Sequence, residues 1–165
     1  MSPPAIRFAR PEDGPGYLRL VRELAEFEKL DPPSPEAERR LLEDAFGKDP
    51  KYELLVALAG REVVAYAIVL RTYSSFLAKP TLYLEDLYLS PGHRGSGLAE
   101  RMMGTLAQLA LDRGWGRLEG IVLTWNDRAR RFYERTGAKE LRDWYFFRYD
   151  EAALEALAEK GGGPA

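Results

Sequence analysis

The chain has 165 residues, of which 45% are hydrophobic and 30% are charged, and its net charge of −2 provides no positive field for nucleic acid or anionic lipid. Because it contains no apolar run of about 18 residues and no signal-like start, we expect a globular cytoplasmic protein with neither a nucleic-acid nor a membrane partner. Its lack of cysteine excludes disulfides, thiolate zinc sites and a cysteine acyl-enzyme, and one histidine cannot form a multi-histidine metal site, so we expect no metal.

The N-terminal part of the chain predicts a short strand at residues 6–8 and a helix at residues 16–30. Apolar residues of this helix repeat at spacings of three and four, so one stripe faces a core. Glu28 continues this stripe, four residues after Leu24. A carboxylate at such a position either lines a site or reaches solvent at the helix end, and the pattern leaves both open.

A proline-rich loop at residues 31–35 separates this helix from a second one at residues 36–46. Two strands at 52–58 and 63–70 follow, and the glycine-containing turn between them predicts a hairpin. A further strand is predicted at residues 82–89.

The most informative segment follows this strand, where a glycine-rich turn opens directly into a helix at residues 98–113. Gly95 and Gly97 allow a tight turn and a close approach of the backbone, and the helix directs its first N–H groups into that turn. The segment therefore predicts an anion site. A Walker A loop would need a lysine after the glycines, and a dinucleotide fingerprint would need a glycine where Glu100 stands, so both fit poorly.

The C-terminal part predicts a strand at residues 117–123, a helix that Asn126 caps and Gly137 ends, and a last strand at residues 144–149. Tyr133 lies on the apolar face of that helix, where it is either packing or part of a site. His93 is expected to be a polar loop residue. We predict one domain over residues 1–160 and a flexible tail at 161–165.

Arg94, Gly97 and Ala99 form the pattern Arg-x-x-Gly-x-Ala, which resembles the acyl-CoA pyrophosphate motif of the GNAT superfamily of N-acetyltransferases. Further segments resemble its diamine acetyltransferase branch, which includes spermidine/spermine and thialysine N-acetyltransferases. The resemblance implies an α/β GNAT fold with a mixed central sheet of six to seven strands flanked by about four helices, and a homodimer. The matching segments are residues 18–28, 41–47, 83–86, 94–97, 125–126 and 132–133.

The resemblance also implies an N-acetyltransferase that moves the acetyl group of acetyl-CoA to a primary amine of a small molecule by direct attack. Glu85 would accept the amine proton and Tyr133 would protonate the leaving thiolate, while Phe27, Glu28 and Glu85 would border the amine. The residues that it assigns to acetyl-CoA are Leu87, Tyr88, Leu89, Arg94, Gly95, Ser96, Gly97, Leu98, Ala99, Asn126, Arg128 and Tyr133.

Two points about the acceptor stay open. Strand alternation predicts that only one of Glu85 and Asp86 faces the cleft, and we expect it to be Glu85. Polyamine-specific relatives carry Asp-Pro-Trp where this chain has Ser74-Ser75-Phe76, which disfavours a long polycation. A short amine, a lysine-like amino acid and a metabolite amine are then comparable acceptors. The alternatives are a non-catalytic acyl-CoA-binding regulatory module and a protein N-acetyltransferase.

Overall fold

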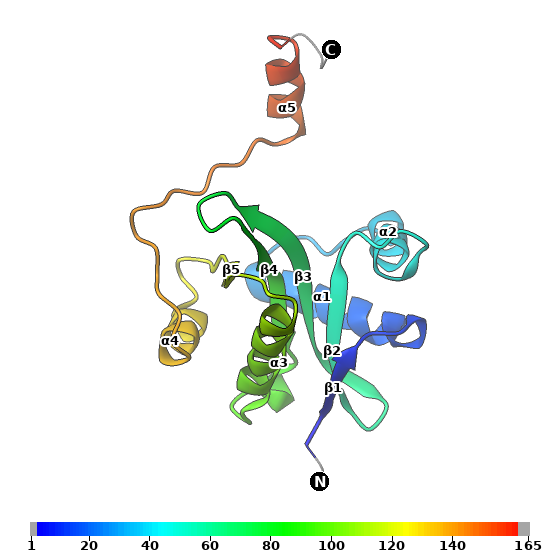
Figure 1. The fold of residues 1–165 in the computed structure, drawn as a ribbon. Coiled ribbons are helices and arrows are strands. Elements are labelled where there is room, and N and C mark those ends of the chain that lie inside the picture. Colours follow the sequence, from blue (N-terminus) through cyan, green and yellow to red (C-terminus); the bar gives the residue numbers. More distant parts are fainter. Residues whose placement is uncertain (1–2, 162–165) are drawn as a thin grey trace. The chain divides into compact units, whose positions relative to one another are not determined.

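The computed structural model describes residues 3–161, which form two compact units, one ending at Leu123 and one beginning at Thr124. The first unit is built around a sheet (Figure 1). Its elements are β1 (Ala5–Phe8), α1 (Gly14–Glu28), α2 (Pro35–Phe46), β2 (Glu53–Ala59), β3 (Glu62–Ser74), β4 (Lys79–Leu89), α3 (Leu98–Asp112) and β5 (Leu118–Gly120), with 3₁₀ turns at Pro11–Asp13 and Pro91–His93.

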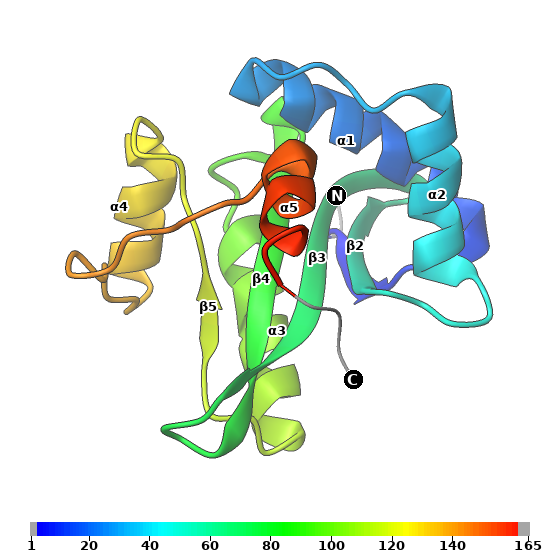
Figure 2. The same cartoon turned by 90° about the horizontal axis from the view of Figure 1, so that it is seen from above.

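The sheet has the strand order β1-β2-β3-β4-β5, in which the first four strands are antiparallel and β5 runs parallel to β4. The predicted hairpin is present, and Gly60 takes a φ of 64° in its turn. Helices α1 and α2 cover one face of the sheet and α3 covers the other (Figure 2). The mixed α/β architecture is therefore confirmed.

The core on the α1 face explains why that helix forms where its apolar stripe predicts. Tyr17 and Leu20 of α1 are fully buried against Tyr66 and Val56 of the sheet. Burying side chains of this size contributes about 1.5–3 kcal/mol each, which is more than the intrinsic helix propensity of any residue provides. Packing against the sheet thus stabilises α1.

A β-bulge interrupts β4 in the middle of its pairing with β3. Val69 lies opposite Leu84 and Ile68 lies opposite Asp86, so Glu85 is an extra residue on β4. Such a bulge bends its strand, and the pairing of β4 with β5 ends at Leu84. This explains why β5 has three residues rather than the seven predicted at 117–123. Beyond the bulge, the β5-facing edge of β4 has no β5 partner in the described part of the sheet.

The second unit contains α4 (Asp127–Arg135) and α5 (Glu151–Ala158). The predicted caps of α4 are confirmed, because the Asn126 side chain accepts from the Ala129 N–H at 3.1 Å and Gly137 follows with a φ of 98°. Helix α5 was not predicted, although Asp150 gives its start signal by accepting from the Ala153 N–H at 2.9 Å.

The predicted strand at residues 144–149 is wrong. This segment forms no ladder within residues 3–161, and Trp144 and Tyr145 are 74% and 87% exposed. Its aromatic composition favours a strand, but a strand exists only where a neighbour completes its hydrogen bonds. Residues 3–161 accordingly contain five strands rather than six to seven, and five helices rather than about four. The single domain over residues 1–160 stays a prediction, and the predicted tail, apart from Gly161, lies outside the described residues.

Candidate functional site

The glycine-rich turn between β4 and α3 has the conformation that its sequence predicts. Gly95 and Gly97 have φ angles of 77° and 79°, a region that residues with a Cβ atom rarely adopt. Gly97 precedes the first residue of α3, and no side chain caps the helix there. Apart from the glycines and their direct chain neighbours, no atom lies within 4 Å of where a Cβ would stand at either glycine. The turn therefore has open space above it, next to the N–H groups of a helix N-terminus.

Arg94 ties this turn to the rest of the first unit. Its Nε donates to the Leu89 carbonyl oxygen at 3.0 Å, and its guanidinium carbon lies 5.2 Å from the centre of the Tyr88 ring and 5.3 Å from that of Phe27. These contacts are in the range of cation–π attraction. Arg94 thus joins the end of β4 to the end of α1. A cleft of about 350 Å³ lies beside it, lined by Glu23, Glu26, Phe27, Tyr88, Ser90, Pro91 and Arg94.

The other predicted residues of the turn and of β4 occupy this same region. Leu87 is half-buried, whereas Tyr88 and Leu89 are buried. Ser96 donates its hydroxyl to the His93 carbonyl oxygen at 2.8 Å, which closes the turn. The expectation for His93 holds, because its Nδ1 lies 3.1 Å from the Ser90 hydroxyl within the loop. Leu98 is buried and Ala99 is half-buried at the start of α3.

Three carboxylates gather near the bulge. Asp86 lies on the α1 face of the sheet, because residues directly opposite each other share a face and its partner Ile68 belongs to that core. Burial, together with the negative charges of Glu85 and Glu28, raises the pKa of Asp86 to about 6, although the hydrogen bond from the Tyr66 hydroxyl lowers it in part. Glu28, the last residue of α1, is half-buried, and burial raises its pKa.

The bulge decides which of the two acids is more enclosed, whereas the expectation that Glu85 faces the acceptor stays a prediction. Glu85 is exposed and Asp86 is half-buried, with Oδ2 of Asp86 accepting from the Tyr66 hydroxyl at 3.3 Å. Regular alternation would have placed Glu85 and Asp86 on opposite faces, but a bulge adds a residue and breaks alternation. The sequence analysis did not single out Asp86 as the more enclosed acid, because only the cross-strand register reveals the bulge.

The remaining predicted residues belong to the second unit, and the structure does not place them with those of the first. Asn126 caps α4, and Arg128 is exposed on it. Tyr133 is half-buried with the Phe132 ring packed edge-on at 5.2 Å, and burial raises the pKa of its phenol to about 12.

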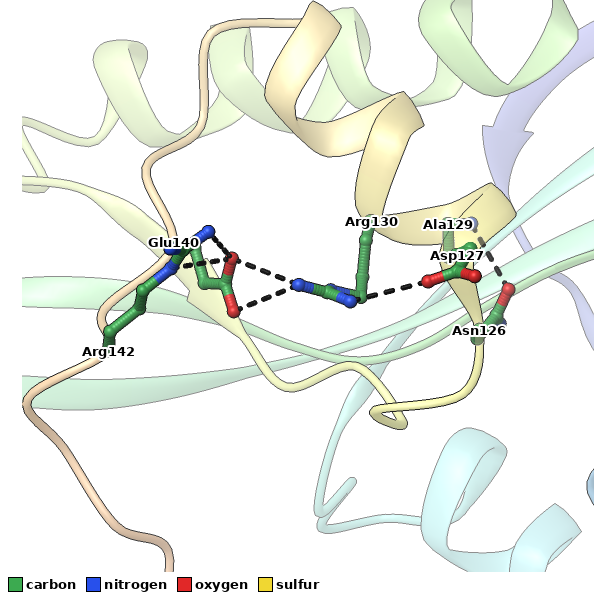
Figure 3. Close-up of polar contacts among 6 residues, drawn as sticks. All are labelled: Asn126, Asp127, Ala129, Arg130, Glu140 and Arg142. Atoms are coloured by element: carbon green, nitrogen blue, oxygen red, sulfur yellow. Dashed lines mark hydrogen bonds and ion pairs between the residues drawn. The ribbon is translucent and has the colours of Figure 1, made fainter.

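Ion pairs fasten the start of α4 to the segment that follows it. Figure 3 shows Arg130 lying between Asp127, at 3.3 Å, and Glu140, at 3.2 Å, while Arg142 reaches Glu140 from the other side at 3.1 Å. Such exposed pairs contribute little individually. Their arrangement nevertheless links the helix that carries Tyr133 to the chain beyond it.

Among residues 3–161 there is neither a candidate metal site nor a helix that could span a membrane. Within residues 3–161, His, Asp and Glu side chains form no group of three or more that could hold a metal ion. None of the helices in that range is both long and apolar enough to cross a membrane.

The first unit and the start of the second match known proteins. The family model described as "Acetyltransferase (GNAT) family" matches residues 18–138. The thialysine N-epsilon-acetyltransferase of Bos taurus is 38% identical over 94% of this chain and 97% of its own length. The human spermidine/spermine N(1)-acetyltransferase-like protein 1 is 31% identical over 93% of this chain, which is 23% of that protein.

Solved structures agree on the fold. An integron cassette protein from the mobile metagenome of V. cholerae superposes with a TM-score of 0.81 at 21% identity, covering 96% of this chain and 99% of that one. At this identity the match supports the fold alone, whereas the sequence matches extend over nearly the full chain. The protein therefore belongs to the GNAT acetyltransferase family, within the branch of thialysine and spermidine/spermine acetyltransferases.

Proposed function

We propose that this enzyme transfers the acetyl group of acetyl-CoA to the primary amine of a small molecule, with a lysine-like amino acid as the first candidate acceptor and a short diamine as the second. The observation that carries the proposal is the group of carboxylates Glu28, Glu85 and Asp86 at the bulge of β4, where the charges of Glu28 and Glu85 act on Asp86. A primary alkylamine has a pKa of about 10.4 and arrives as a cation, so a cluster of negative charges attracts it.

Acetyl-CoA fits the turn, because the space over Gly95 and Gly97 is open and the N–H groups of α3 point toward it. We assign the pyrophosphate to the backbone of residues 94–99. The β5-facing edge of β4 at Leu87 and Leu89 offers backbone groups to an extended chain such as pantetheine. Tyr88 and Arg94 lie beside this edge and are assigned to the same ligand. We assign Asn126 and Arg128 to acetyl-CoA as well, on the basis of family membership.

In the proposed chemistry the carboxylates first attract the ammonium group, and Glu85 then accepts its proton, directly or through water. Acetyl-CoA supplies the thioester carbon that the neutral amine attacks, so a C–N bond forms and the C–S bond breaks. Tyr133 protonates the departing sulfur. Its raised pKa keeps the phenol protonated at neutral pH, as a proton donor requires. Phe27 borders the amine on the α1 side.

The end of β3 supports a short acceptor. Ser74 is buried, and its hydroxyl accepts from the Leu77 N–H at 3.3 Å, so it stabilises the β3–β4 turn and provides no negative charge. A long polycation would need such a charge at a distance from the reacting amine. Thialysine and lysine need only one cluster of negative charges for the ammonium and a place for the amino-acid end.

The test is release of coenzyme A from acetyl-CoA with thialysine, lysine, ornithine, putrescine, spermidine and a lysine-containing peptide as acceptors. We expect the highest kcat/KM with an amino acid, and Glu85→Gln should raise the amine KM or shift the pH profile. Turnover of the peptide alone would favour a protein acetyltransferase, and tight acetyl-CoA binding without any turnover would favour the binding module.

We also propose a homodimer, which the exposed aromatic residues of segment 144–149 support. Sedimentation equilibrium would measure it, and a monomer at all concentrations would refute it.

A further inference from the structure

Tyr66 is a fully buried tyrosine whose hydroxyl contacts the Asp86 carboxylate. It lies on β3 directly opposite Tyr88 of β4, two positions from the pair that Ile68 forms with Asp86. Its hydroxyl donates to Oδ2 of Asp86 at 3.3 Å. A phenylalanine would fill the same space in the core, so packing does not explain why this residue has a hydroxyl group.

Two aromatic neighbours fix the Tyr66 ring. Tyr17 of α1 packs edge-on against it, with ring centres 5.1 Å apart and planes at 75°, and Tyr88 lies 6.4 Å away at 44°. Tyr17 is itself held by a hydroxyl contact of 3.1 Å with Tyr52, which donates to the Leu41 carbonyl oxygen at 2.7 Å. A ring held on both sides keeps its hydroxyl in one place.

The groups that face Asp86 do not otherwise favour its charge. Glu85 on β4 and Glu28 on α1 repel it, and the phenols of Tyr17 and Tyr52 are neutral groups near it. Burial also opposes ionisation. Of the influences identified on this carboxyl group, the Tyr66 hydrogen bond is the one that lowers its pKa.

We propose that Tyr66 is a positioning residue, which holds the Asp86 carboxylate ionised and oriented toward the amine of the acceptor. The inference rests on the proposed function, because it assigns Asp86 to the cluster of negative charges that attracts the ammonium. Tyr66 itself touches neither substrate. Its hydroxyl acts through Asp86, so its removal should affect the acceptor and spare acetyl-CoA.

The decisive variant is Tyr66→Phe, which removes one oxygen and keeps the ring. Tyr17→Phe is the matched control, because it removes a buried hydroxyl from the neighbouring tyrosine, which has no hydrogen bond to Asp86. In each protein, carbon-13 NMR of the Asp86 side-chain carboxyl against pH gives the titration midpoint without any substrate. Steady-state kinetics near pH 6.5 give the KM values for amine and acetyl-CoA.

We expect the Asp86 midpoint to rise by about one pH unit in Tyr66→Phe and to stay in place in Tyr17→Phe. At pH 6.5 the ionised fraction of Asp86 then falls about threefold, so the amine KM should rise about threefold while the acetyl-CoA KM is unchanged. Adding Tyr66→Phe to Asp86→Asn should raise the amine KM no further.

An unchanged midpoint in Tyr66→Phe, or an equal rise in Tyr17→Phe, overturns the proposal. A raised midpoint with an unchanged amine KM overturns the positioning role. If the wild-type enzyme acetylates no amine, the proposed function fails. The substrate-free titration still tests whether the Tyr66 hydroxyl lowers the titration midpoint of Asp86.

Discussion

Asp86 should destabilise the folded chain at neutral pH, so Asp86→Asn should stabilise it. The substitution removes the charge, preserves the shape, and leaves an oxygen that can accept from Tyr66. A half-buried carboxylate near the charges of Glu85 and Glu28 is costly to ionise, whereas an amide in its place carries no charge.

The sign and size of this effect follow from the pKa of Asp86, which rises from an ordinary value of 3.8 to about 6 on folding. Between these values the folded state binds more protons than the unfolded state, so the contribution of Asp86 to stability falls as pH rises through this window. Two pH units correspond to about 3 kcal/mol, and because Asp86 is only half-buried, solvent screening reduces this to about 1–2 kcal/mol.

Urea unfolding, followed by circular dichroism at a series of pH values from 3.5 to 7.5, measures the effect in the wild-type enzyme and in Asp86→Asn. The variant minus wild-type difference in the free energy of unfolding should increase across the window between 3.8 and about 6 and level off above it. Carboxylates that do not interact with Asp86 cancel in this difference. A difference that is constant with pH, or that falls, would refute the argument that Asp86 is enclosed and ionised at a cost.

Three further predictions test other parts of the molecule. Asp13 should behave in the opposite way to Asp86, because its pKa is lowered on folding. It is buried, which acts to raise its pKa, but it accepts from Arg7 at 2.6 and 3.0 Å, and the bonds from Arg7 and Arg10 lower the pKa overall. Asp13→Asn should therefore cost about 2–3 kcal/mol in urea unfolding near pH 7, and this cost should shrink as pH falls below 3.8; a cost independent of pH would contradict it. Gly97→Ala should lower the free energy of unfolding by about 1 kcal/mol, because an alanine is strained at a φ of 79°, and it should weaken acetyl-CoA binding measured by calorimetry. The control Gly104→Ala, inside α3, should raise the free energy of unfolding by about 0.5 kcal/mol. Equal effects of the two substitutions would argue against a strained turn. Tyr133→Phe should lower kcat roughly 10²-fold with acetyl-CoA affinity unchanged, and an unchanged kcat would remove Tyr133 from the acid role.

The sequence by itself determined the elements that depend on local patterns. Periodicity predicted α1 and α3, because a helix buries one stripe whatever it packs against. The glycine-rich turn was predictable for a similar reason, since positive φ angles at Gly95 and Gly97 are a property of glycine itself. The cap at Asn126 involves contacts within a few residues and was also correct.

Only the tertiary structure decided features that depend on a partner distant in the sequence. Segment 144–149 has a strand's composition, yet its strand did not form, because backbone N–H and C=O groups need a neighbouring strand that composition does not provide. The bulge at Glu85 exists only in the register of β4 against β3, and that register encloses Asp86 beside Tyr66. The sequence thus determined that two acids stand next to each other on β4, and the pairing of β3 with β4 decided which of them is more enclosed.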